Sequence, residues 1–208
     1  MRICIVLYAG EVMYKLCKTE SSTKRQREIE EALFSLLKQK NYEDITITEL
    51  SEKMNMPRKA FYRYFDSKDD ALFALIDHQM LEYSAFTEDK SGDKSRSLTR
   101  ELEDYFKFWM GKRDLLTVLD RSSLIGILIE RTVTFPISDR ISIAKFLPGE
   151  GGKAREKIFK FAFVGLVYTM IEWYRSDFDT PPIDMARLAC RMLKMPLFPS
   201  LSNLGFID

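Results

Sequence analysis

A cluster of cationic and aromatic side chains lies between residues 53 and 68. Its residue types and spacing are those best suited to a functional site in this sequence. Five positive residues stand there against Asp66 alone, a local net charge of +4: Lys53, Arg58, Lys59, Arg63 and Lys68. The whole chain carries only +1. A local basic surface of this kind can meet nucleic-acid phosphates. The alternative is a solvated face on a helical hairpin.

The rest of the composition argues against catalysis and metal binding. The chain has one histidine, His78, and three cysteines, Cys4, Cys17 and Cys190, with no CxxC spacing. One histidine cannot build a multi-histidine site, and we expect its side chain to be hydrogen-bonded or solvent-facing. The cysteine pattern is typical of a reducing cytoplasm. We expect no catalytic residues, no metal and no cofactor, and no apolar run approaches a membrane span.

The sequence on both sides of the basic cluster has helical periodicity almost throughout, so helices are expected to position the cluster. With 208 residues the chain has room for one or two domains. The 3.6-residue periodicity predicts an all-α fold. Helices are expected at about residues 22–40, 47–55, 58–64, 68–86, 97–110, 114–130, 153–177 and 183–194. The first should be capped by Ser22 or Thr23, and polar or glycine-rich loops are expected at 91–95 and 148–152.

Residues 1–20 form an N-terminal extension whose role the residues leave open. Residues 3–9 are apolar, but Glu11 follows early. A signal peptide, a short extra strand or helix packed on the body, and a translation start at Met13 are the three interpretations.

The local signals around the cluster predict a helix-turn-helix. Thr46 and Glu49 have capping-box spacing, and Asn55 suits the left-handed residue that ends a helix. Pro57 suits the first turn of the next helix. Inward-facing residues are expected at Ile47, Leu50, Met54, Phe61 and Phe65. The second helix of such a motif can lie in the DNA major groove.

At these residues the sequence resembles the TetR family of transcriptional regulators. The resemblance covers about residues 23–80 and is carried by segments 46–51, 53–56 and 60–73, with Tyr62, Phe65, Lys68 and Leu72 at the family's aromatic, lysine and leucine positions. Asn55, Pro57 and Ala60 depart from the family's usual residues, which puts the operator sequence in doubt.

The resemblance implies an N-terminal three-helix DNA-binding domain at 21–68 and a helical effector-binding and dimerisation domain at 69–208. Implied DNA contacts are Thr46, Thr48, Arg58, Lys59, Tyr62, Arg63, Tyr64 and Lys68. Arg58 and Lys59 would read guanine, Tyr62 and Tyr64 would contact backbone and thymine methyl groups, and Lys68 would clamp a phosphate. For Arg63 a phosphate contact and a solvated position stay equally open.

The C-terminal half is apolar enough to be covered on all sides, since Lys160 is the only charge from 158 to 171. Pocket candidates are Phe106, Trp109, Met110, Leu119, Phe135, Phe163, Tyr168 and Met170, each of which could instead simply fill the core. Dimer-interface candidates are Phe161, Gly165, Tyr168, Met185, Leu188, Ala189 and Met192.

The resemblance therefore implies a ligand-responsive homodimeric regulator of transcription. The expected partners are double-stranded DNA with a near-palindromic operator and a small, largely apolar effector that releases a repressor. The alternatives are a TetR-like activator and a helical protein-interaction module that acts through a partner protein.

Overall fold

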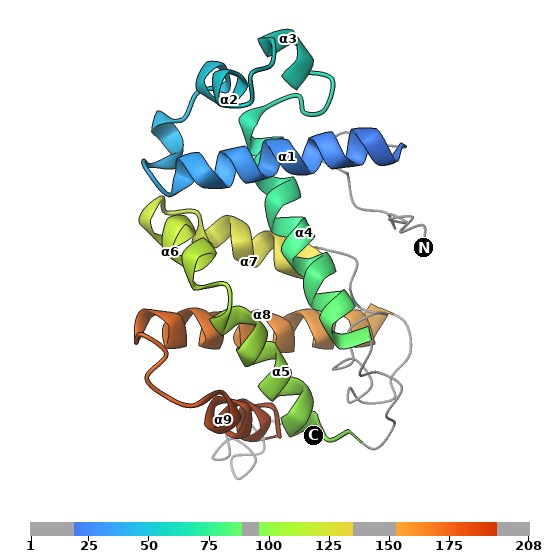
Figure 1. Ribbon diagram of the computed structural model, residues 1–208. Helices are drawn as coiled ribbons and strands as arrows, with labels where there is room; N and C mark the ends of the chain where they lie inside the picture. Colours follow the sequence, from blue (N-terminus) through green and yellow to red (C-terminus); the bar gives the residue numbers. More distant parts are fainter. Residues whose placement is uncertain (1–18, 89–95, 135–152, 195–208) are drawn as a thin grey trace. The chain divides into compact units, whose positions relative to one another are not determined.

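The computed structural model describes residues 19–88, 96–134 and 153–194, and every regular element in these ranges is helical (Figure 1). The elements are α1 (Glu20–Leu37), the 3-10 helix η1 (Tyr42–Asp44), α2 (Ile47–Lys53), α3 (Arg58–Phe61), α4 (Lys68–Glu88), α5 (Leu98–Met110), α6 (Arg113–Arg121), α7 (Ile125–Thr134), α8 (Lys153–Arg175) and α9 (Pro182–Lys194). The predicted all-α fold is confirmed. The predicted features of residues 1–18, 89–95 and 135–152, including Phe135 and both loops, lie outside the described residues.

Two compact units make up the described chain. The first contains α1 to α3, α4 as far as Ala85, and α6 and α7. The second contains α5, α8 and α9. These units are defined by packing. The boundary expected at residue 68 separates a DNA-binding domain from an effector-binding domain by function, and it stays a prediction.

The core of the first unit follows the predicted apolar faces. Ile29, Leu33, Leu36 and Leu37 of α1 are all buried, as their spacing predicts. They share the core with residues from every other helix of the unit, namely Leu50, Phe61, Phe65, Leu72, Ile76, Leu116, Leu119 and Leu128.

The start of α1 and the region predicted as one helix at 114–130 both differ from the prediction. Thr19, not Ser22 or Thr23, caps α1, because Ser22 occupies the third helical position and completes a capping box with Thr19. The single helix expected at 114–130 is two helices, α6 and α7. Ser123 is left-handed, with φ of 57°. The Leu124 N–H then bonds the Leu119 carbonyl at 2.8 Å, which closes α6 in a Schellman-type turn.

Buried polar contacts tie α4 to its neighbours in the first unit. His78 of α4 hydrogen-bonds Glu30 of α1, and Arg27 lies 3.7 Å from the same Glu30 oxygen. Arg131 of α7 holds Asp77 of α4 through both carboxylate oxygens, with its Nε 2.9 Å from Oδ1. Such pairs fix one orientation of the helices because each partner would be costly to leave buried alone.

An aromatic cluster forms the core of the second unit. Phe106 meets Trp173 at 5.3 Å between ring centroids, and Tyr105 meets Phe163 at 6.2 Å, with both contacts edge-on. The Trp173 indole N–H donates to the Thr180 carbonyl at 2.9 Å, which fixes the turn from α8 into α9.

Candidate nucleic-acid interface

The first helix of the motif, α2, begins with the predicted capping box. The Thr46 hydroxyl accepts from the Glu49 N–H at 3.2 Å, and the Glu49 carboxylate accepts from the Thr46 N–H at 3.1 Å. Lys40 pairs with the other Glu49 oxygen. That hydrogen bond, with help from Thr46, holds the pKa of Glu49 below its ordinary value. The Thr46 hydroxyl is thus engaged within the protein, and its DNA contact stays a prediction.

The turn between α2 and α3 is closed by the predicted left-handed residue. Asn55 has φ of 48°, and the Met56 N–H then bonds the Ser51 carbonyl at 3.0 Å. Buried Met56 and Ser51 fill the angle between the two helices. Pro57 precedes α3 as its N-cap residue and does not lie in the first turn as predicted.

The second helix is shorter than the predicted 58–64. Regular α-helix ends at Phe61, and residues 62–64 continue as a turn because the Arg63 and Tyr64 N–H groups bond three residues back. Phe61 and Phe65 are fully buried, as predicted, with ring centroids 5.8 Å apart. These rings anchor the short helix, so its other face points outward.

That outward face carries the predicted contact residues. Arg58, Lys59 and Arg63 are exposed, as is Thr48 on α2, while Tyr62 is 37% exposed and Tyr64 half-buried. The Arg58 guanidinium donates to the Tyr62 hydroxyl at 3.2 Å. Lys59, Tyr62 and Arg63 line a shallow surface depression of about 470 Å³ with Pro57 and Ala60. The surface offers exposed cations beside flat rings, which suits phosphates and base edges.

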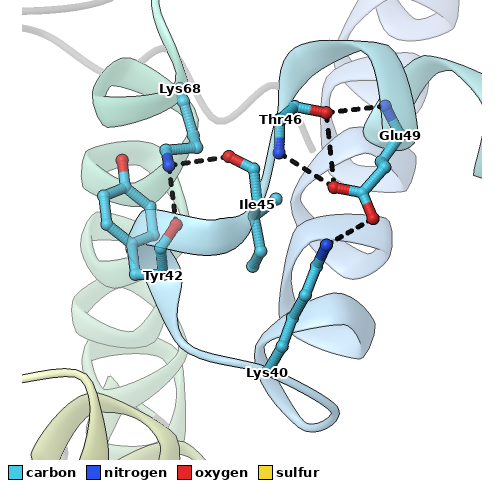
Figure 2. Close-up of polar contacts among 6 residues, drawn as sticks. All are labelled: Lys40, Tyr42, Ile45, Thr46, Glu49 and Lys68. Atoms are coloured by element: carbon cyan, nitrogen blue, oxygen red, sulfur yellow. Dashed lines mark hydrogen bonds and ion pairs between the residues drawn. The ribbon is translucent and has the colours of Figure 1, made fainter.

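Lys68 differs from the other cations because its ammonium is bonded within the protein. It donates to the Tyr42 carbonyl at 2.6 Å and the Ile45 carbonyl at 2.7 Å, and lies 4.1 Å from the centroid of the Tyr42 ring (Figure 2). Burial lowers the pKa of Lys68, and the carboxylates of Asp69, Glu43 and Asp44 oppose that shift. Lys68 therefore attaches η1 and the start of α2 to α4, and its predicted phosphate clamp stays a prediction.

Sequence reasoning missed Tyr42, which it treated only as part of a break between helices. Its hydroxyl bonds Asp69, its carbonyl accepts from Lys68, and its ring is buried. Burial and the Asp69 carboxylate raise the pKa of Tyr42 far above its ordinary value. The sequence signal that could have revealed the role of Tyr42 is that it is a single aromatic residue in a polar segment.

The pocket candidates do not gather in one place. Phe106, Trp109, Phe163 and Met170 are buried in the second unit, whereas Leu119 is buried in the first. Met110 and Tyr168 are 40% and 54% exposed and face solvent in the monomer. An effector site among the four buried residues stays a prediction.

The dimer candidates also divide. Phe161, Gly165 and Tyr168 of α8 and Leu188 and Met192 of α9 are exposed, with Phe161 at 70%. Met185 and Ala189 are instead buried within the protomer.

Comparison with known proteins agrees with this geometry. Residues 29–75 match the family model described as bacterial regulatory proteins, tetR family. The matched range spans most of α1, the whole of α2 and α3, and the start of α4. The motif is therefore a helix-turn-helix DNA-binding domain. Over these residues the chain is similar to the tetR family of bacterial regulatory proteins, as the sequence resemblance predicted.

Solved structures share the fold. A TetR transcriptional regulator from Rhodococcus sp. RHA1 is 16% identical, with 86% of this chain and 100% of that one covered at a TM-score of 0.55. The fatty acid degradation regulator FadR from Bacillus halodurans is 11% identical. The match covers 87% of this chain and 98% of that one at a TM-score of 0.54. The dihydroxyacetone kinase operon activator DhaS is 12% identical. The match covers 81% of this chain and 93% of that one at a TM-score of 0.50.

No curated protein matches the sequence significantly. Over the ranges that the structure describes, no helix is both long and apolar enough to cross a bilayer.

Proposed function

We propose that the protein is a homodimeric repressor that binds a near-palindromic operator and leaves it when a small, largely apolar effector binds. The observation that carries DNA binding is the exposed set of Arg58, Lys59 and Arg63 on the second helix of a capped helix-turn-helix. The same cations argue against a protein-interaction module that has lost DNA binding.

A twofold dimer follows from the small reading length of each motif. One recognition helix reads only a few base pairs, which is too little for genomic specificity, so two copies on paired half-sites are needed. Phe161, Val164 and Tyr168 form an exposed stripe on α8 at helical spacing. An apolar stripe of this kind is suited to a second copy of the chain.

Selection from a random duplex library tests the operator. The wild-type protein should enrich an inverted repeat. Arg58→Ala should weaken binding to that duplex by about 1–3 kcal/mol and relax the preference at one base position in each half-site. Enrichment of no sequence at low salt would contradict the proposed function, and an unchanged preference in Arg58→Ala would contradict the assignment of Arg58.

Repression is the simplest consequence of operator binding, because a dimer that covers a promoter excludes polymerase without a further partner. Activation is the alternative, since DhaS, which shares the fold, is described as an operon activator. Transcription in vitro from the DNA upstream of its own gene separates the two. Added protein should lower the transcript yield, and a rise would establish the activator.

The effector is proposed to bind in the aromatic core of the second unit. Both tryptophans of the chain, Trp109 and Trp173, are buried there, so tryptophan emission reports on that unit. Saturated fatty acids of increasing length are suitable probes, because FadR, which shares the fold, regulates fatty acid degradation.

A probe that shifts the emission should weaken DNA binding by the same factor by which DNA weakens the binding of the probe. Release of DNA by a compound that competes at Arg58 would contradict this mechanism.

A further inference from the structure

The segment between α1 and α2, residues 38–46, has little regular structure of its own apart from η1. We call it the α1–α2 connector. It leads directly into Thr46, the residue that caps α2, so the position of the connector decides where the helix-turn-helix begins. A segment with so few internal bonds is positioned by the side chains that other elements direct at it.

One set of contacts reaches the connector from α4. Lys68 donates to the carbonyls of Tyr42 and Ile45, and the Tyr42 hydroxyl bonds Asp69 (Figure 2 shows the Lys68 bonds). These contacts hold the side of the connector nearest to α2.

A second set reaches the connector from the corner between α6 and α7. Arg121, the last residue of α6, donates to the Leu37 carbonyl and, at 3.2 Å, to the Lys40 carbonyl. The next residue, Ser122, accepts the Tyr42 N–H on its hydroxyl at 3.2 Å. Outside the corner, Lys38 pairs with Asp114, the second residue of α6, at 2.5 Å. A guanidinium at the carbonyl end of α1 is also favoured by the helix dipole.

Tyr42 is the residue at which the two sets meet. Its N–H is held by Ser122, its carbonyl by Lys68 and its hydroxyl by Asp69, and it is 7% exposed. A buried N–H without a partner is costly, so loss of the Ser122 hydroxyl would disturb the residue that α4 also holds.

We propose that Arg121 and Ser122 are positioning residues for DNA binding: the α6–α7 corner sets the helix-turn-helix by holding the α1–α2 connector. This inference rests on the proposed function. A motif that is already ordered binds more tightly because the cost of ordering it is not incurred on binding. Loosening the corner should therefore weaken DNA binding although neither residue belongs to the predicted DNA contacts.

The variants are Ser122→Ala, Arg121→Met and Arg121→Lys in the full chain. Thr117→Ala, at an exposed hydroxyl of α6, controls for the first, and Arg100→Met, at an exposed cation of α5, controls for the second. The DNA probe is the duplex that the wild-type protein enriches from a random library, titrated at several salt concentrations below the unfolding temperature of every variant.

Ser122→Ala and Arg121→Met should each raise the Kd by about three- to tenfold, the value of one or two hydrogen bonds. The salt dependence should not change, because no phosphate contact is lost. Arg121→Lys should recover part of the affinity, since it keeps a cation at the same carbonyls. In the DNA-free protein, amide exchange at Tyr42 and through α2 should become faster.

A wild-type Kd in both variants would overturn the inference, as would an unchanged exchange rate at Tyr42. A reduced salt dependence would also overturn it, because it would mean that Arg121 contacts phosphate directly. Failure of the wild-type protein to enrich any duplex would instead contradict the proposed function, and the exchange measurement would still decide whether the corner holds the connector.

Discussion

The cations near the helix-turn-helix are of two kinds. Lys59 and Arg63 are exposed on the outward face, whereas Lys68 is half-buried and bonded to two carbonyls. The residue type alone does not separate them. Only an exposed ammonium can replace counterions around DNA, so the two lysines should behave differently when they are removed.

Lys59→Met and Lys68→Met form a matched pair that tests this difference. Lys59→Met should weaken binding to every sequence and lower the salt slope by about 1, with little change in stability. Lys68→Met should reduce the free energy of unfolding by about 2 kcal/mol, because charged hydrogen bonds to backbone carbonyls are lost. Salt titrations and urea unfolding measure the two effects. If Lys68→Met instead had wild-type stability and a lower salt slope, the result would support the predicted phosphate contact of Lys68.

The buried carboxyl of Glu30 should make stability depend on pH. Burial raises the pKa of Glu30 above its ordinary value of 4.5, while His78 and Arg27 oppose the shift and Asp77 adds to it. Between pH 4.5 and the raised pKa the native state keeps a proton that the unfolded chain releases. In that range the free energy of unfolding therefore falls as the pH rises, by at most about 1.4 kcal/mol per pH unit.

Glu30→Gln removes this proton and keeps the side-chain shape. The difference in unfolding free energy, wild type minus variant, should decrease as the pH rises from about 4 to about 7. Thermal or urea unfolding across this range measures it. Glu31→Gln, at an exposed neighbouring position on α1, controls for the lost charge. Parallel pH curves for wild type and Glu30→Gln would contradict the prediction.

Among the helices, α2 and α3 are too short to be stable alone. They comprise seven and four residues, and isolated helices of this length do not persist in water. The capping box at Thr46 and the left-handed residue Asn55 define where each helix begins and ends. Buried Phe61 and Phe65 attach the second helix to the core.

Substitution of Asn55 tests the turn. Asn55→Ala should reduce the free energy of unfolding by about 1 kcal/mol, because alanine lacks the short polar side chain that lets asparagine adopt the left-handed region at φ of 48°. Asn55→Gly should match or exceed the wild-type stability, because glycine adopts this conformation without strain. Urea unfolding of both variants is the measurement. Equal stability of the alanine and glycine variants would show that the left-handed conformation is not maintained.

For the whole molecule, the exposed stripe of α8 bears on assembly. Phe161 is 70% exposed and Tyr168 54%, and Gly165 lies between them with nothing within 4 Å of the position a Cβ would take. A side chain at Gly165 therefore fits the protomer. A change at this position therefore tests the proposed dimer without disturbing the fold of the protomer.

Gly165→Lys should make the protein monomeric or poorly soluble and abolish operator binding. A lysine in an apolar interface is an unpaired charge that costs several kcal/mol. Gly126→Lys is the matched control, because Gly126 of α7 is also exposed with nothing near its Cβ position. Sedimentation at micromolar concentration measures assembly. A wild-type monomer that protects a full palindrome would defeat the dimer argument.

The sequence by itself determined the features that depend on a few neighbouring residues. The apolar face of α1, the Thr46–Glu49 capping box, the left-handed Asn55 and the buried Phe61 and Phe65 were all predicted correctly. Each is signalled by residues within about four positions of one another along the chain, where spacing alone shows which residues share a face. The family resemblance was recognisable because its motif is built from such local signals.

The tertiary structure alone decided which polar groups meet across long stretches of chain. Lys68 reaches Tyr42 over 26 residues, and Arg121 reaches Leu37 over 84. The break between α6 and α7 at Ser123 forms the corner from which Arg121 and Ser122 contact the connector. The apolar periodicity of the sequence runs through this break without marking it. A lysine bonded to buried carbonyls and a lysine on an exposed helix face are identical in the sequence. They differ only in what surrounds the ammonium once distant segments have packed together.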